Sequence, residues 1–267
     1  MFEFFLDIPE PSPYNLNMFK RAANNPKRPG TRALILSTAL QVFRERGLEA
    51  STMRDLAASA KISLGAAYYY FPSKEAIIQA YYDEVQTEHA RRMAGVLQDS
   101  HLDLNARLRA AFQTKMDILQ GDRKLMGALF RFAGEPEHPL SFLGPGTRQN
   151  RQQSLDVFTA AIGDERLPAD IALLLPTALW ALHMGILLFF IYDDSPQQER
   201  TRKLVDSSIT LLTRLLLLVK LPILKPVRGG ILSILRDAGL IPEVNVSETP
   251  AKSSDAQELL QRKDHQS

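Results

Sequence analysis

Helix start and stop signals follow one another closely between residues 31 and 75, and they constrain the fold more than any other feature of the sequence. Apolar residues recur at helical spacing over residues 31–46, and a glycine follows directly as a stop signal. Thr52 and Asp55 have the three-residue spacing of an N-terminal capping box. Ser63 can cap a third helix, which runs to about Phe71. The segment is therefore predicted to form three short helices.

Helical periodicity also dominates the rest of the chain, and strand-like alternation is scarce. Proline and glycine gather over residues 134–146, which we expect to form a loop. A short amphipathic piece lies around Ile231, and residues from about 243 onward are polar and expected to be disordered. The expected fold class is all-α, with longer helices at residues 74–97, 104–120, 124–132, 147–162, 169–192 and 197–219.

The composition limits the sites that the chain can build. With 267 residues, 45% of them hydrophobic, it can form a sizeable core in one or two domains. It has no cysteine, so disulfides and thiolate metal sites are excluded, which fits a reducing cytoplasm. The opening residues lack the basic start and long apolar core of a signal peptide. They are too apolar for a free tail, so either they dock on the body or translation begins at Met18.

Positive charge is concentrated near the N-terminus, although the formal net charge of the whole chain is only +2. The segment 20–32 contains no acidic residue, and its prolines and glycine are typical of a flexible arm. Such an arm can neutralise DNA phosphates, and it can equally be a solvated linker. The basic residues of this arm are Lys20, Arg21, Lys27, Arg28 and Arg32.

The residue identities in the first segment resemble those of a known family. The first predicted helix ends in LQVFRERG, the second starts at Thr52, and the third leads into the run YYYFPSKE from Tyr68 to Glu75. Over about residues 31–80 this pattern resembles the DNA-binding signature of the tetracycline-repressor family. The resemblance implies a helix-turn-helix, whose second helix enters the major groove. It also implies a larger C-terminal helical domain that binds a small molecule and carries the dimer interface.

Side chains around the second and third helices have the chemistry to bind DNA. The small residues early in the third helix allow its backbone to approach the groove closely. Tyrosine hydroxyls can bind phosphates, and an arginine can reach a guanine edge. Threonine and lysine at helix starts can share a phosphate with the helix N-terminus. The candidate DNA-binding residues are Thr52, Arg54, Gly65, Ala66, Tyr68, Tyr69, Tyr70 and Lys74.

Not every residue of this segment is expected to contact DNA. For Tyr70, packing and DNA contact are both open, because its ring can pack while only the hydroxyl emerges. Lys61 occupies a turn position where the family usually has glycine, which costs backbone energy if its φ is positive. Leu64 stands where a polar or basic residue is common, so one phosphate contact fewer is expected. The residues expected in the core are Phe43, Ile62 and Phe71.

The run from Ile171 to Tyr192 carries no charged side chain, and two kinds of helix can contain such a run. One is a membrane span, and the other is a helix buried on all sides of a dimeric bundle. Pro176 and His183 interrupt the run. The following helix places Asp206 and Arg214 opposite its leucine stripe. Both observations favour the bundle, so no membrane association is expected.

Aromatic and methionine side chains at inward spacing predict a cavity for a small hydrophobic or aromatic effector, although each of them also suits an ordinary core. His183 is the most informative, because an imidazole within an uncharged helix needs a hydrogen-bond partner. That partner is either an effector or a neighbouring side chain. The candidate cavity residues are Phe112, Met116, Leu119, Met126, Phe130, Trp180, His183, Met184 and Phe189.

No motif for catalysis or metal binding is evident. The sequence lacks a phosphate-binding glycine loop, a G-x-S-x-G elbow and an H-E-x-x-H pair. Its five histidines are scattered, and none pairs with another at metal-ligand spacing. Glu135, Glu137 and His138 do cluster, but the surrounding prolines indicate a solvated loop. We therefore expect no catalytic residue, no metal and no cofactor, with an enzyme as the alternative.

The sequence as a whole predicts a cytoplasmic repressor that binds a near-palindromic operator as a homodimer and is released by its effector. Activation in place of repression is also compatible with it. The predicted division is an N-terminal extension over residues 1–30 and a DNA-binding domain over 31–78. An effector-binding and dimerisation domain follows over 79–221, and a C-terminal extension over 222–267.

Overall fold

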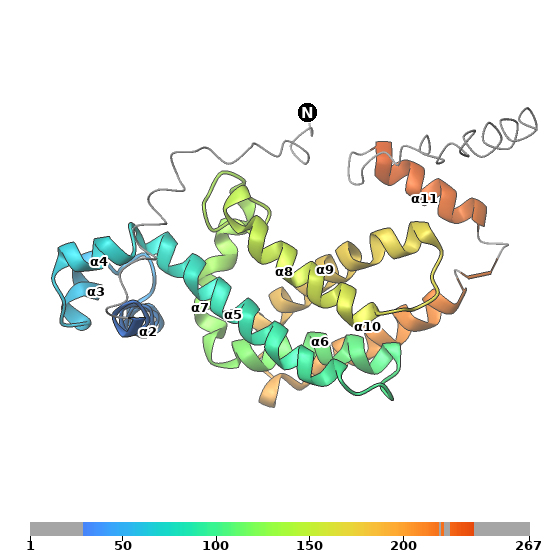
Figure 1. Ribbon diagram of the computed structural model, residues 1–267, viewed down its shortest axis with the longest axis horizontal. Helices are drawn as coiled ribbons and strands as arrows, with labels where there is room; N and C mark the ends of the chain where they lie inside the picture. The colour runs from blue at the N-terminus through green and yellow to red at the C-terminus, as the bar shows by residue number, and fades with distance from the viewer. Residues whose placement is uncertain (1–28, 219, 222–224, 238–267) are drawn as a thin grey trace, which may run out of the picture. The chain divides into compact units, whose positions relative to one another are not determined.

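The computed structural model describes residues 29–218, 220–221 and 225–237, and every regular element within these ranges is a helix (Figure 1). The prediction of an all-α chain is therefore confirmed. Helices α2 to α10 belong to one compact unit, whereas α11 (Lys225–Asp237) belongs to a second and contains the expected amphipathic piece. The arm over residues 20–28, the apolar start and the polar tail lie outside the described residues.

Three helices near the N-terminus pack together, and a fourth leads from them into the helical body (Figure 1). Their shared core includes Ile35, Leu36 and Phe43, all less than a tenth exposed. Each helix ends within a few residues of its predicted boundary. The four are α2 (Pro29–Arg46), α3 (Met53–Ser59), α4 (Leu64–Tyr70) and α5 (Lys74–Leu97).

Side-chain caps begin three of these helices at the residues that the sequence indicates. At α3 the Thr52 amide donates to Asp55 Oδ2 at 2.8 Å, and the Asp55 amide donates to Thr52 Oγ1 at 3.2 Å. Ser63 Oγ accepts the amide hydrogen of Ala66 at the start of α4. Ser73 Oγ likewise accepts an amide hydrogen at the start of α5. These bonds satisfy amide groups that lack intrahelical partners, so local sequence determines the spacing of the helices.

The helical body is built from α5 and five further helices, whose apolar faces meet in one core. Phe112, Phe158 and Phe190 are at most 1% exposed and lie on three different helices. The predicted loop over residues 134–146 forms turns and ends in a 3₁₀ turn, Pro145–Thr147. The five helices are α6 (Leu104–Leu119), α7 (Arg123–Phe130), α8 (Arg148–Ile162), α9 (Ala169–Tyr192) and α10 (Glu199–Leu218).

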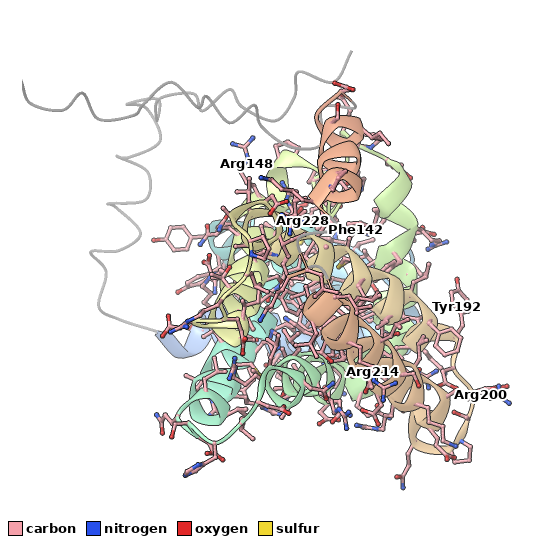
Figure 2. The ribbon with its side chains drawn as sticks, turned by 90° about the vertical axis from the view of Figure 1, so that its right-hand side faces the viewer. Phe142, Arg148, Tyr192, Arg200, Arg214 and Arg228 are labelled. Carbon is pink, nitrogen blue, oxygen red and sulfur yellow. The ribbon has the colours of Figure 1, made fainter. Side chains whose placement is uncertain are left out.

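Helix α9 is the uncharged run that the sequence singles out. Among the described residues it is the one helix long and apolar enough to cross a membrane, and a third of its most apolar window is buried. It packs against α6, α7, α8 and α10, as a central helix of a bundle does. Tyr192 at its C-terminal end is 76% exposed and points away from the helices (Figure 2). Helix α9 therefore presents one apolar face to the core and another to the outside.

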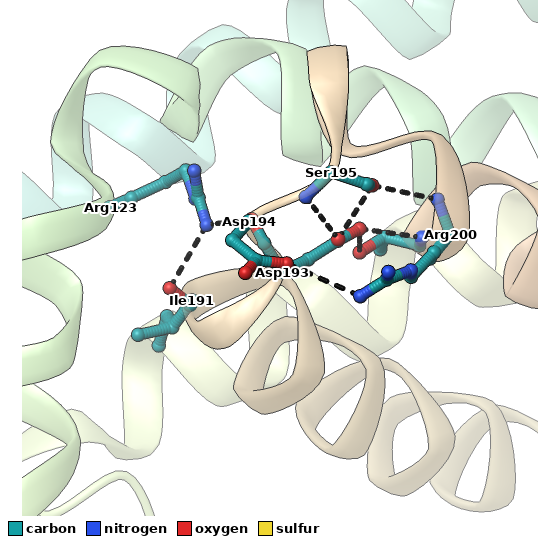
Figure 3. Close-up of polar contacts among 7 residues, drawn as sticks. Arg123, Ile191, Asp193, Asp194, Ser195 and Arg200 are labelled. Carbon is teal, nitrogen blue, oxygen red and sulfur yellow. Dashed lines mark hydrogen bonds and ion pairs between the residues drawn. The ribbon is translucent and has the colours of Figure 1, made fainter.

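The corner between α9 and α10 is fixed by a small polar network (Figure 3). The Asp193 carboxylate accepts four hydrogen bonds, from the amide and hydroxyl groups of Ser195 and Thr201, at 2.6–3.0 Å. Burial alone would raise the pKa of Asp193, but these bonds outweigh it and hold the pKa well below its usual range. Arg123 of α7 donates to the carbonyl groups of Phe190, Ile191 and Asp193, which caps the C-terminus of α9.

Candidate nucleic-acid interface and effector cavity

Helices α3 and α4 are joined by a tight turn, in which Lys61 has φ of +55°. This positive φ confirms that the turn requires a left-handed residue, the conformation that favours glycine. The Ile62 amide donates to the Ala57 carbonyl at 3.0 Å and closes the turn. Leu64 is half-buried and packs against the core. The turn therefore holds α4 as the second helix of a helix-turn-helix.

Most of the predicted DNA-binding side chains lie on the outside of this unit. Tyr68 is 50% exposed and Tyr69 65% exposed. Tyr70 is half-buried, and its ring meets the Tyr69 ring edge-on at 5.2 Å. Thr52 and Arg54 are exposed at the start of α3, and Ala66 is half-buried.

The residues predicted for the core of this unit do lie in it. Phe43 and Phe71 are buried as predicted, and Ile62 is half-buried against the same core.

Gly65 is exposed on the first turn of α4, between the cap and the tyrosines. A Cβ atom at this position would meet nothing within 4 Å, and the residue does not have a positive φ. The fold of the free protein therefore gives no reason for a glycine here. A helix surface that must approach another molecule closely would be a reason for a glycine at this position, because glycine has no side chain to hold the backbone away.

Lys74 has a structural contact that the sequence does not predict. Its ammonium donates to the Leu48 carbonyl at 2.7 Å and so ties the start of α5 to the turn after α2. An ammonium has three hydrogens to donate, which leaves capacity for a phosphate. The predicted phosphate role remains a prediction, and Lys74 also holds two elements of the unit together.

A cavity lies within the helical body between α5, α6, α7, α8 and α9. The empty space within it is about 700 Å³, a figure that includes space open to solvent. Most of its wall is apolar. The predicted residues that line it are Leu119, Met126, Phe130, Trp180, His183 and Met184.

Three residues predicted to line the cavity lie elsewhere. Phe112 and Met116 are at most 1% exposed and belong to the core of the body. The Phe112 ring nevertheless contacts the His183 ring edge-on, with centroids 5.4 Å apart. Phe189 faces outward and is 42% exposed. Helical spacing identifies the inward face of a helix, but it does not distinguish a cavity from filled core.

The sequence reasoning missed the polar strip on the cavity wall. Lys115 of α6 is 2% exposed and donates to Gln86 Oε1 at 2.7 Å, while Gln86 Nε2 donates to Ser154 Oγ at 2.8 Å. All three side chains line the cavity. Burial lowers the pKa of Lys115 to about 7. The signal was present in the sequence, because Lys115 interrupts the apolar stripe formed by Leu108, Ala111, Phe112 and Leu119.

His183 has no hydrogen-bond partner on either ring nitrogen among the described residues. It is 2% exposed, and its ring lies against Phe112 and Phe158. Burial, followed by the nearby positive charge of Lys115, lowers its pKa well below the usual value, so the ring is neutral. The sequence left open whether His183 bonds to an effector or to a neighbouring side chain. Among the described residues, no neighbouring side chain forms that hydrogen bond.

One hydrogen-bond network links the cavity to helix α2 of the N-terminal unit. Arg44 of α2 donates to both oxygens of Asp122, at 2.5 and 3.2 Å. The Tyr81 hydroxyl donates to the same carboxylate at 2.8 Å, and the Tyr81 ring lines the cavity. Burial and the Asp122 charge raise the pKa of Tyr81, so the hydroxyl keeps its proton. A second, exposed pair between Arg131 and Glu49 crosses the same junction away from the cavity.

The described residues contain no cluster of three histidine, aspartate or glutamate side chains that could hold a metal ion. Glu135 and Glu137 lie in the exposed loop, where the His138 ring stacks on the Phe132 ring at 3.9 Å. The two candidate sites are thus an exposed polar and aromatic face on α3 and α4, and a cavity with a polar strip in the helical body.

Comparison with known proteins agrees with this architecture. Residues 35–81 match the family described as bacterial regulatory proteins of the tetR family, and residues 107–227 match the tetracyclin repressor-like C-terminal domain. The chain is 43% identical over 58 residues to the uncharacterized HTH-type transcriptional regulator YuxN of Bacillus subtilis, which covers 20% of each chain. It is 28% identical over 151 residues to the HTH-type transcriptional repressor KstR2 of Rhodococcus jostii, covering 53% of this chain and 70% of that one.

Solved structures share the same fold. A TetR transcriptional regulator from Nitrosomonas europaea superposes with a TM-score of 0.55 at 22% identity, covering 67% of this chain and 96% of its own. The fatty acid degradation regulator FadR from Bacillus halodurans gives a TM-score of 0.54 at 16% identity, with coverages of 68% and 96%. The two family matches, together with the helix-turn-helix and the helical body, show that the chain belongs to the TetR family of DNA-binding transcriptional regulators.

Proposed function

We propose that this chain is a cytoplasmic, ligand-responsive repressor that binds a near-palindromic operator as a homodimer and releases it when an effector occupies the cavity. In this proposal the two α4 helices of a dimer enter successive major grooves on one side of the DNA. Their separation then equals about one helical turn, roughly 34–36 Å, or a multiple of it. The polar and aromatic chemistry of the sites supports recognition in place of catalysis.

The observation that carries the DNA role is the exposed face of α4. Two neighbouring tyrosines remain half or more exposed next to Gly65, which packs against nothing. Neighbouring exposed aromatic side chains are typical of a surface that binds a partner. Tyrosine hydroxyls suit phosphates and ring edges suit thymine methyl groups, while Arg54 of α3 suits a guanine.

The outward faces of α9 and α10 support the homodimer. These two helices are adjacent and carry a concentration of exposed large apolar side chains, which a monomer seldom leaves in water. A second copy of the same face would bury them, as the two-fold interface of most homodimers does. The exposed apolar residues are Leu173, Leu188, Phe189, Tyr192, Leu204, Leu211, Leu215, Leu217 and Leu218.

The network of Tyr81, Asp122 and Arg44 supports communication between the cavity and the DNA-binding helices. An effector that displaces the Tyr81 ring also displaces the carboxylate that holds the end of α2. Release of DNA then requires that the effector bind the DNA-incompatible arrangement more tightly than the compatible one. The difference between those two affinities limits the response.

A gel shift with the duplex upstream of the chain's own coding sequence tests this function. We expect a specific complex of two protomers per duplex, whose affinity falls with salt because phosphate contacts release counterions. A random duplex of equal length is the control. Arg54→Ala should weaken specific binding by about 1–3 kcal/mol and leave random binding unchanged. Equal shifts of both duplexes, or one protomer per duplex in sedimentation, would contradict the proposal.

A further inference from the structure

The polar strip of the cavity contains a buried amine, Lys115, with no acidic side chain in the described cavity wall. Among the described residues that line the cavity, Lys115 and Arg151 are basic and none is acidic. Arg151 already donates to the Phe142 carbonyl at 2.8 Å, whereas the amine of Lys115 donates to Gln86 Oε1 at 2.7 Å. Buried lysines without a paired anion are rare in folded proteins, because removing an ammonium from water is costly.

Two histidines beside this amine leave further polar capacity unused. His89 Nε2 faces the Ala111 carbonyl at 2.9 Å, so it carries the ring proton, and Nδ1 remains an unpartnered acceptor. His183 has neither of its nitrogens satisfied and lines the cavity together with Lys115. Buried polar groups without a hydrogen-bond partner destabilise the fold. A structural core would gain by filling this region with apolar side chains, so the arrangement suits a ligand.

The rest of the wall indicates the body of that ligand. Trp180, Met184, Met126 and Phe130 present aromatic and thioether surface to the same cavity, and Leu187 adds to it. A neutral apolar effector would fit this part and leave Lys115 and His183 unpaired. A cation would be repelled by Lys115. An anion on an apolar body satisfies both parts of the wall.

We propose that the effector is an amphipathic organic acid, whose carboxylate pairs with the Lys115 ammonium and the His183 N–H while its apolar body lies against Trp180 and Met184. This inference rests on the proposed function, since it names the class of effector for the same cavity. It sharpens the expectation from the sequence, which covered only the hydrophobic or aromatic body.

The test compares acids with their uncharged primary amides, which have nearly the same shape. Octanoate and octanamide form one pair, and 3-phenylpropionate and 3-phenylpropionamide form the other. Binding to the DNA-free protein is followed by the fluorescence of Trp180, the single tryptophan of the chain. We expect at least one acid to bind about tenfold or more tightly than its amide, because the acid makes a charge-assisted hydrogen bond.

Variants assign this preference to one residue. Lys115→Met should abolish the preference for acids, and an unchanged or raised thermal midpoint will show that it folds. Lys124→Met, at an exposed lysine of α7, should retain the preference. Amides that bind as tightly as acids, acids that fail to bind, or a preference that survives in Lys115→Met would each overturn the proposal.

The DNA measurement separates this proposal from the proposed function. Acid-selective binding that leaves the operator complex intact would refute release by the effector, while the anion site itself would stand. A specific operator complex combined with a cavity that prefers amides would refute the anion site alone.

Discussion

At the scale of single residues, the structure separates buried polar side chains whose hydrogen bonds the fold supplies from those whose hydrogen bonds it leaves unmade. Lys115 is buried with Gln86 as a hydrogen-bond acceptor but with no acidic side chain in the described cavity wall, and neither ring nitrogen of the buried His183 has a partner among the described residues. Asp193 is equally buried but accepts four hydrogen bonds, so its charge is fully compensated. Buried polar groups without such compensation lower the free energy of unfolding, whereas a buried carboxylate with its hydrogen bonds made does not carry this cost.

The stability of a Lys115→Met variant should depend on pH in a defined direction. The pKa of Lys115 is about 7 in the fold, below its value near 10.4 in the unfolded chain. Between these values the amine takes up a proton on unfolding, so its cost to stability is full below about pH 7 and vanishes above about pH 10. Lys115→Met should therefore raise the thermal midpoint more at about pH 6.5 than at about pH 9.5.

The titratable groups facing Lys115 do not reverse this sign. Burial, with a further contribution from the charge of Lys115, lowers the pKa of His89 on α5 to about 3, and the pKa of His183 on α9 is also well lowered. Both rings therefore stay neutral over the tested range. Differential scanning calorimetry measures the midpoints, with Lys124→Met as the exposed control. A stabilisation that is independent of pH would show that Lys115 is not a buried titrating amine.

At the scale of helices, capping side chains decide where each helix begins, and small residues decide how closely it can be approached. Thr52, Ser63 and Ser73 accept amide hydrogens at the starts of α3, α4 and α5. The first turn of α4 then carries Gly65, which neither the backbone conformation nor packing requires. A local feature without a role in the fold is the kind expected at a binding surface.

Gly65→Ala should separate folding from DNA binding. Alanine favours a helix by up to about 1 kcal/mol over glycine, so the thermal midpoint should stay or rise. The added methyl group would stand between α4 and the groove, so we expect operator affinity to fall about tenfold or more, about 1.4 kcal/mol. Gly95→Ala, at an exposed glycine of α5 with equally open space, is the matched control for fluorescence-anisotropy titrations. Equal affinities of the two variants would remove the close-approach role.

At the scale of the whole described unit, two ion pairs cross from the DNA-binding helices to the body. The pair between Arg44 and Asp122 is partly buried and shares its carboxylate with a cavity-lining tyrosine. The pair between Arg131 and Glu49 is exposed, with more than half of each side chain in contact with solvent. Exposed pairs contribute about 0–1 kcal/mol, so only the first pair is expected to carry a response.

Asp122→Asn should reduce the coupling between effector and DNA. The coupling is the ratio of effector affinities measured with and without operator, and thermodynamic linkage makes it reciprocal. We expect it to fall by about 0.5–2 kcal/mol, because Arg44 and Tyr81 lose the charge that holds them to one group. Glu49→Gln, at the exposed pair, should leave the ratio unchanged. If the two variants have the same coupling, the network does not transmit the signal.

The sequence by itself determined where the helices of this protein begin and end. Helix boundaries could be predicted because caps such as Thr52 and Ser63, and breakers such as Pro72, act on their own neighbours in the chain. The family and the burial of Phe71 could also be predicted, because both depend on a short contiguous pattern of residues.

Only the tertiary structure decided which inward-facing residues meet at a cavity. Phe112 and Met126 have the same apolar character and helical spacing, yet one fills the core and the other lines the cavity. The partners of Lys115 and Asp122 lie 29 and 78 residues away along the chain. Such contacts depend on how whole helices pack, and packing is a property of several faces together that no single helix encodes.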